Sequence, residues 1–136
     1  MTDAVSAISS LLYNNWSLTS PDKNSIYWAK SRFETVDFAK VGKSNIVACY
    51  QLTANVKGLT FETWQVEETV AIDILSKEPS LRNDMREEVY RIIHANEHAV
   101  SGYVWVHIVR EANSVESIDL ARTTIHVACL SWKTKP

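Results

Sequence analysis

The sequence predicts an α+β fold, in which a mainly antiparallel, twisted sheet has an N-terminal helix and one central amphipathic helix packed on one face. Apolar residues alternate from Trp64 to Ile74, as in a half-buried strand. After a break at 76–80, apolar residues recur every three or four positions, as in an amphipathic helix. This stripe consists of Leu81, Met85, Val89 and Ile92, with Ile93 alongside. A strand with one apolar face, followed by a helix with one apolar stripe, indicates a helix lying across a sheet.

Length and composition indicate a single globular domain over 1–136. Apolar residues make up 46% of the chain and charged residues 22%, and the net charge of −2 predicts no strong attraction for nucleic acid. The start of the sequence lacks the basic and apolar regions of a signal peptide, so we expect a protein made in a reducing cytoplasm. Cys49 and Cys129 fall in expected strands and are interpreted as free buried thiols, although neighbouring strands would also allow a bridge.

The first half of the chain is expected to hold the N-terminal helix and the first strands. The expected elements are a helix over 3–13 capped by Thr2 or Asp3, a loop over 19–25, a short strand over 26–30, an irregular segment over 31–43 and a strand over 45–53. Residues 54–58 are expected to form a hairpin turn, because Gly58 tolerates positive φ. The next strand would start at residue 59 or 60 and run to Leu75, with a bulge near residue 62 or 67–68.

The second half is expected to begin with the central helix, over 80–96, with Ser80 as its N-cap. Glu87 and Arg91 lie four residues apart in the favourable order and are expected to pair. A strand over 103–110, a polar connection over 111–118 and a last strand over 119–132 complete the expected sheet. Both of these strands carry apolar or aromatic residues on their second face, for which subunit packing is a candidate cover.

No catalytic signature is present in the sequence. His94 and His98 could share a metal on one helix face, but their order is not that of the HExxH zinc motif, and polar histidines near a helix C-terminus are the simpler interpretation. His107 and His126 fall on the last two strands without a nucleophile motif. Four carboxylates are spaced as on a solvated strand face: Glu62, Glu67, Glu68 and Asp73. We therefore expect no bound metal or cofactor.

Three stretches share their pattern with a known family. The first is 3–16, a helix ending near Trp16. The second joins the strand 68–77 to the Arg/Glu-rich helix start at 81–89. The third is the closing pair of strands, 103–110 and 121–132, with Arg122 opening the last strand. In these stretches the chain resembles the tail terminator or tail-completion (head-tail joining, neck) proteins of long-tailed bacterial and archaeal viruses.

This resemblance implies a virion structural protein and not an enzyme. Such a protein would cap the tail tube as a homo-oligomeric, hexameric ring, end tube growth and form the head-tail joining interface. Its partners would be the tail tube protein and a head-completion or connector protein. DNA would pass through the channel without sequence-specific binding, no membrane would be involved, and assembly would take place in the host cytoplasm. The expected subunit contacts are Tyr27, Trp28, Phe33, Tyr103 and Trp105. The expected channel-facing residues are Glu62, Glu67, Glu68 and Asp73.

A second interpretation is a small-ligand-binding module or enzyme of generic α+β fold. It requires a pocket between helix and sheet, with His107 as its polar group. The aromatic lining of that pocket would be Trp28, Tyr50 and Trp105. The two interpretations differ in how the structure must arrange these side chains.

Overall fold

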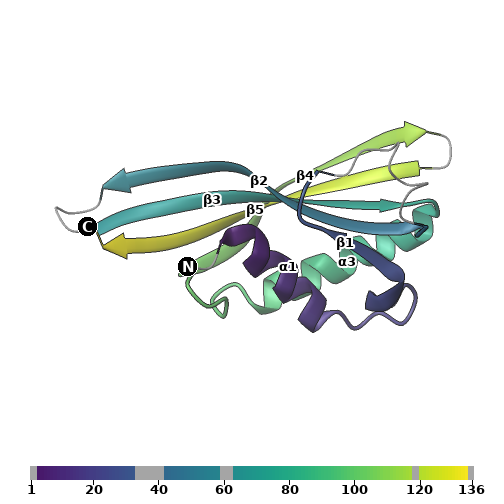
Figure 1. Cartoon of the computed structure of the whole chain (residues 1–136), viewed down its shortest axis with the longest axis horizontal. Coiled ribbons are helices and arrows are strands. Elements are labelled where there is room, and N and C mark those ends of the chain that lie inside the picture. The colour runs from purple at the N-terminus through teal and green to yellow at the C-terminus, as the bar shows by residue number, and fades with distance from the viewer. Residues whose placement is uncertain (1–2, 33–41, 59–62, 118–119, 135–136) are drawn as a thin grey trace.

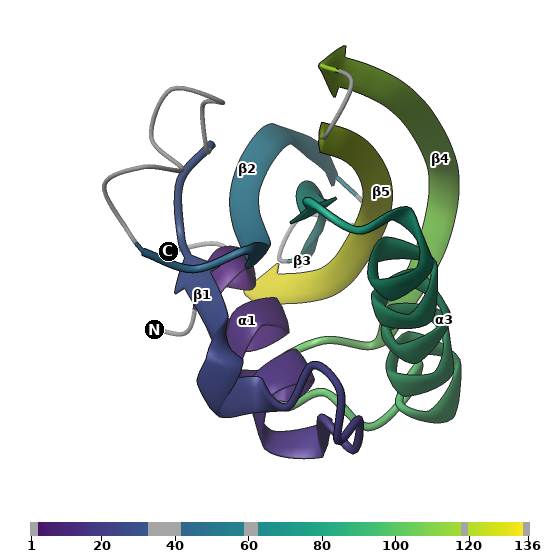
Figure 2. The ribbon, with the colours of Figure 1, turned by 90° about the vertical axis from the view of Figure 1, so that its right-hand side faces the viewer.

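The computed structural model describes residues 3–32, 42–58, 63–117 and 120–134, which form two α-helices and a sheet of five strands (Figure 1). The helices are α1 (Ala4–Asn15) and α3 (Pro79–Ala95), and a short 3-10 helix, η1 (Lys23–Ser25), precedes the first strand. The strands are β1 (Ile26–Ala29), β2 (Asn45–Gly58), β3 (Thr63–Ser76), β4 (Trp105–Ser117) and β5 (Leu120–Thr134). Both helices lie on the same side of the curved sheet, which confirms the predicted α+β class (Figure 2).

The sheet has the strand order β1-β2-β3-β5-β4, and the strand with the longest alternating pattern lies at its centre. This strand, β3, pairs antiparallel with β2 on one side and with β5 on the other. The β4 and β5 strands form a second antiparallel hairpin, and only the short β1 is parallel to its neighbour, β2. Helix α3 connects β3 to β4, and these two strands are not neighbours in the sheet because β5 lies between them.

The main core fills the space between the sheet and the two helices. Ile72 and Ile74 of β3 are fully buried there against the apolar stripes of α1 and α3. These stripes include Ala4, Ile8 and Leu12 of α1, and Met85, Val89, Ile92 and Ile93 of α3. The apolar stripes found in the sequence are therefore the buried faces of the two helices. Burying one such aliphatic side chain stabilises the fold by about 1.5–3 kcal/mol. No helix in the described ranges is long and apolar enough to cross a membrane.

The side of the sheet away from the helices is called the second face. It receives the alternate residues of β3, among them Glu67 and Asp73, because successive side chains of a strand point to opposite faces. A small separate cluster of Ala29, Ile46, Ala48 and Leu75 is buried apart from the main core. Cys49 and Cys129 both belong to the main core as free thiols on β2 and β5, and β3 separates their strands, so no bridge joins them.

Two strands are longer than predicted, and the errors share one cause. The expected turn at 54–58 is instead the end of β2, and the expected polar connection at 111–118 is mostly the end of β4. Every residue from Gln51 to Gly58 is exposed, as are Ala112, Asn113 and Ser114. A strand end that is solvated on both faces has no apolar alternation to reveal it. Residues 59–62 and 33–41, which include Phe33 and Glu62, lie outside the described part of the chain.

The expected bulge in the long strand lies instead on its partner. The β2–β3 register shifts between Gln51 and Thr53, so that Leu52 is the extra residue, opposite the step from Val70 to Thr69. A one-residue insertion of this kind bends its own strand and strengthens the local twist. The bulge therefore marks the point where β2 leaves the buried part of the sheet and enters its exposed end.

The ends of the helices confirm one capping prediction and correct another. Asp3 caps α1, since its Oδ1 accepts the Ser6 backbone N–H at 2.7 Å. Helix α3 begins one residue earlier than predicted, with Pro79 at its start and Glu78 as the N-cap residue, so Ser80 is not the cap. Proline suits this position because its fixed φ matches the helix and its missing N–H has no intrahelical role there.

The pairing predicted for Arg91 is also wrong, because Arg91 bonds Glu88 instead of Glu87. Glu88 is buried, and its carboxylate accepts hydrogen bonds from the Ser17 backbone N–H at 2.5 Å, the Ser17 hydroxyl at 2.8 Å and Arg91 Nε at 2.6 Å. A second guanidinium nitrogen of Arg91 donates to the Asn15 carbonyl at 2.8 Å. These contacts form the Glu88 clasp, which ties the end of α1 to the middle of α3.

Candidate interaction surfaces

The predicted subunit-contact residues separate into internal and exposed groups. Trp28 lies between Tyr13 and Trp16, with ring centroids 5.6 and 5.3 Å away, and its indole N–H donates to the Lys23 carbonyl at 2.9 Å. Tyr103 packs partly buried against the main core, where burial raises its pKa to about 12. Trp28 and Tyr103 therefore both pack against other side chains of the same chain.

Tyr27 and Trp105 keep more than a third of their side-chain surface exposed, at 37% and 39%. They belong to β1 and β4, which are the two outermost strands of the sheet. A surface that meets the opposite surface of an identical copy forms a head-to-tail contact, and such contacts close into rings when the rotation permits. The two exposed aromatic side chains are therefore placed where a head-to-tail assembly would need them.

The predicted channel carboxylates do not share one environment. Glu67 is exposed on the second face, whereas the adjacent Glu68 is half-buried and points to the helix-covered face. Burial and the nearby Glu68 carboxylate raise the pKa of the Cys129 thiol to about 12, which agrees with Glu68 lying on the core side of the sheet. Because Glu67 and Glu68 point to opposite faces of the sheet, only one of them can line a channel that is formed by a single face.

Asp73 has no exposed surface and corrects the predicted channel set. Its Oδ2 pairs with Arg122 Nη1 at 2.5 Å, while its Oδ1 accepts from Thr124 Oγ1 at 2.7 Å and Tyr50 Oη at 3.3 Å. A buried carboxylate needs such partners, because an unpaired charge away from water is costly. Asp73 therefore stabilises the sheet from within, and we drop it from the channel-facing residues.

Among the most exposed apolar side chains, the sequence analysis placed only Val109 on a surface, on the second face of the expected strand 103–110. Val56 and Leu52 on β2, Val109 on β4 and Trp132 on β5 have exposed fractions of 61%, 42%, 52% and 59%. Val56 lies in the segment interpreted as a turn, and Trp132 at the end of an expected strand, so neither was placed on a surface. Large exposed apolar side chains on a small domain make these strand ends candidates for an interaction surface.

The residues expected to line a ligand pocket do not come together. Trp28 is on β1 and Trp105 on β4, at opposite edges of the sheet, while Tyr50 bonds Asp73. His107 stacks on Trp105 with ring centroids 3.5 Å apart and an angle of 12° between the planes. The arrangement rules out the pocket proposed from the sequence.

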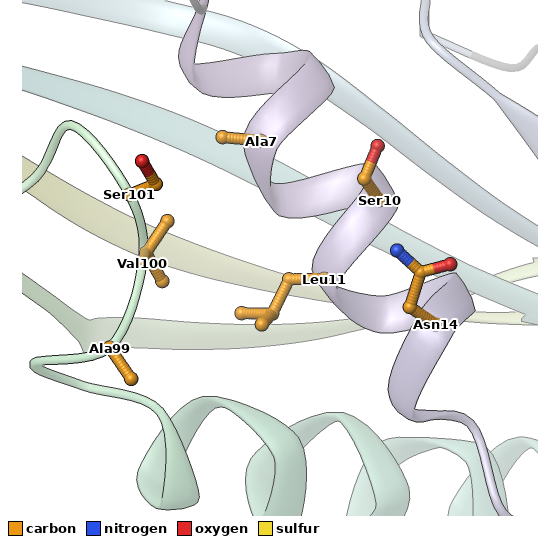
Figure 3. Close-up of a pocket in the computed structure, with 7 residues that line it drawn as sticks. All are labelled: Ala7, Ser10, Leu11, Asn14, Ala99, Val100 and Ser101. Atoms are coloured by element: carbon orange, nitrogen blue, oxygen red, sulfur yellow. The ribbon is translucent and has the colours of Figure 1, made fainter.

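A shallow pocket of about 290 Å³ does lie elsewhere, between α1 and the loop that follows α3 (Figure 3). It is lined by Ala7, Ser10, Leu11, Asn14, Ala99, Val100 and Ser101. None of these side chains titrates near neutral pH, and acid-base chemistry requires a group that does. Within the described ranges, no three His, Cys, Asp or Glu side chains gather as a metal site.

Comparison with known proteins agrees with this fold. No protein-family model matches the chain, and no curated protein sequence matches it. Among solved structures, a chain of the virion of the native gene transfer agent (GTA) particle aligns with 96% of this chain and 95% of its own length. The TM-score is 0.67 and the sequence identity 12%. At this identity the likeness shows a shared fold along nearly the whole of both chains.

Proposed function

We propose that the protein is a virion structural protein of the tail-terminator kind, which forms a ring on the end of a tail tube. The observation that carries this proposal is the nearly full-length fold shared with a chain of the gene transfer agent virion. The sequence resemblance to tail terminator and tail-completion proteins points the same way. On this proposal the ring ends tube growth, contacts the tail tube protein, and offers its other side to a head-completion or connector protein.

Two features of the described surface support an assembling subunit. Exposed aromatic side chains occupy opposite edges of the sheet, at Tyr27 and Trp105, as a head-to-tail ring requires. Among the described members of the predicted channel set, Glu67 is the exposed carboxylate, and we place it toward the channel. An acidic wall repels the phosphate backbone and so lets DNA pass without binding it. The hexameric size remains what the resemblance implies.

Solution mass tests the proposal. We expect light scattering after size exclusion to show a species of about six subunits of 15.4 kDa as the protein concentration rises, or on addition of purified tail tubes. Electron microscopy of the mixture should show tubes capped at one end and no longer growing. A stable dimer at every concentration, with tubes that continue to grow in its presence, would contradict the proposed function.

A further inference from the structure

The described part of the sheet has two edges on which backbone groups face outward. At one edge, β1 pairs with β2 only from Asn45 to Ala48, so the next stretch of β2, from Gln51 to Gly58, is paired on the β3 side alone. At the other edge, β4 is paired only with β5. Part of this second edge is already covered, because the Val106 N–H donates to the Glu97 carbonyl at 2.8 Å. Beyond that contact, no described strand lies against residues 108–113.

The two edges are only partly protected in the ways usual for a strand that stays in water. Natural edge strands are shielded by charges, prolines or short length, since an open edge is a template for another strand. The β2 edge carries a single charged residue, Lys57, over eight exposed residues, and it presents Leu52 and Val56. The β4 edge presents Val109, which is 52% exposed and lies at a break in the β4–β5 register, and it also carries Arg110 and Glu111. Within the described residues, both edges therefore combine outward-facing backbone groups with exposed apolar side chains.

We propose that these two edges pair with each other between copies of the chain, so that 51–58 of one copy adds as a strand to 108–113 of the next. The inference rests on the proposed ring and names the contact that builds it. The occupant of each edge is a second copy because the strand directions fit. The strands β2, β3, β5 and β4 alternate in direction across the sheet. A copy related by rotation about an axis along the strands therefore presents its β2 antiparallel to β4, and the alternation continues across the contact.

The position of the two edges along the strands also fits a ring. The middle of the β4 edge, between Arg110 and Glu111, lies level with the step from Tyr50 to Cys49 on β2. The middle of the β2 edge is about four residues further along once the bulged Leu52 is left out, which is a stagger of about 13 Å at about 3.3 Å per residue. Four strands span about 19 Å at about 4.8 Å each, so the stagger corresponds to a strand tilt of about 35°. Closed sheets have strand tilts of about 35–45°.

A pair of edge variants tests the proposal. Leu52→Lys with Val56→Lys blocks the β2 edge, and Val109→Lys with Ala112→Lys blocks the β4 edge. All four positions are exposed, and the folding of each variant is checked by circular dichroism and thermal unfolding. We expect each variant alone to lose the ring at concentrations at which the wild type assembles. An equimolar mixture should form a dimer and grow no further, because each variant retains the edge that the other lacks.

A control variant and a second measurement make the test independent of these charges. Trp132→Lys changes an equally exposed apolar residue on β5, away from both edges, and should leave the ring intact. In the wild type, amide hydrogen exchange at 51–58 and 108–113 should slow at least tenfold on assembly. A ring that survives in both variants, or assembly without this protection, overturns the strand pairing alone. A wild type that stays monomeric even with tail tubes overturns the proposed function itself.

Discussion

The Glu88 clasp predicts a pH-dependent contribution to stability that one substitution can isolate. The carboxylate is buried but fully bonded, and the hydrogen bonds from Arg91 and Ser17 outweigh the effect of burial, lowering its pKa from 4.5 to about 2. A carboxyl whose pKa is lower in the folded chain stabilises the fold above its unfolded pKa and loses that contribution as the pH falls toward the folded value. The contribution of Glu88 is therefore complete at pH 7 and fades between about pH 5 and pH 2.

The magnitude follows from the two pKa values. A carboxyl moved from 4.5 to about 2 contributes about 3 kcal/mol at neutral pH, and the half-exposed Arg91 reduces this to about 2–3 kcal/mol because water screens its charge. Glu88→Gln removes the charge but keeps the size of the side chain. We expect it to lower the free energy of unfolding by about 2–3 kcal/mol at pH 7, by about half as much at pH 3 and by little at pH 2.

Urea denaturation followed by fluorescence, at pH values from 7 to 2, measures this difference between wild type and variant. The other carboxylates titrate in both proteins, so their effect cancels. Glu87→Gln is the matched control, because Glu87 is exposed and its pair with Arg86 is at the surface; we expect a change below about 0.5 kcal/mol. A loss in Glu88→Gln that stays constant from pH 7 to pH 2 would show that packing, and not the charged form of the clasp, stabilises the α1–α3 contact.

Three further predictions concern the buried groups and the first helix. Asp73→Ala should destabilise the fold by about 3–5 kcal/mol in urea denaturation, because it leaves the Arg122 charge buried, and adding Arg122→Met should restore part of that loss. Cys49 and Cys129, whose pKa values burial raises to about 12, should react with a thiol reagent in urea but not in the native protein; fast native labelling would contradict their burial. Asp3→Ala should lower the midpoint of thermal unfolding through loss of the α1 cap, whereas Asp3→Ser should lower it much less.

The sequence predicted the parts of the fold that have one apolar and one polar side. The central strand and both helices are of this kind, because the environment differs between their two faces. The capping role of Asp3 was also predicted correctly. The ends of β2 and β4 do not, since water surrounds them on both sides, and a polar strand end then has the composition of a loop. The errors therefore mark the places where the sheet extends beyond its helices.

The candidate surfaces were less accessible to sequence reasoning than the fold. A pattern shows which residues alternate, but it does not say which strand lies at an edge, and the separation of Trp28 from Trp105 depends on strand order. Glu88 did leave a signal that was overlooked. It falls seven residues after Leu81 and four before Ile92, on the apolar stripe of α3, where a charged residue must find partners.

The pairing of β3 with β5 has a mechanical consequence. Every residue of β3 from Thr63 to Ser76 faces a partner on β5, and the β2–β3 and β4–β5 connections lie at opposite ends of this ladder. Interstrand hydrogen bonds run across the strands, so a force pulling these two ends apart loads the ladder in shear and strains all of its bonds together. A force that peeled the strands from one end would break the same bonds one after another. The central pair thus makes the subunit stiff along its long axis, the direction in which its two hairpins extend (Figure 1).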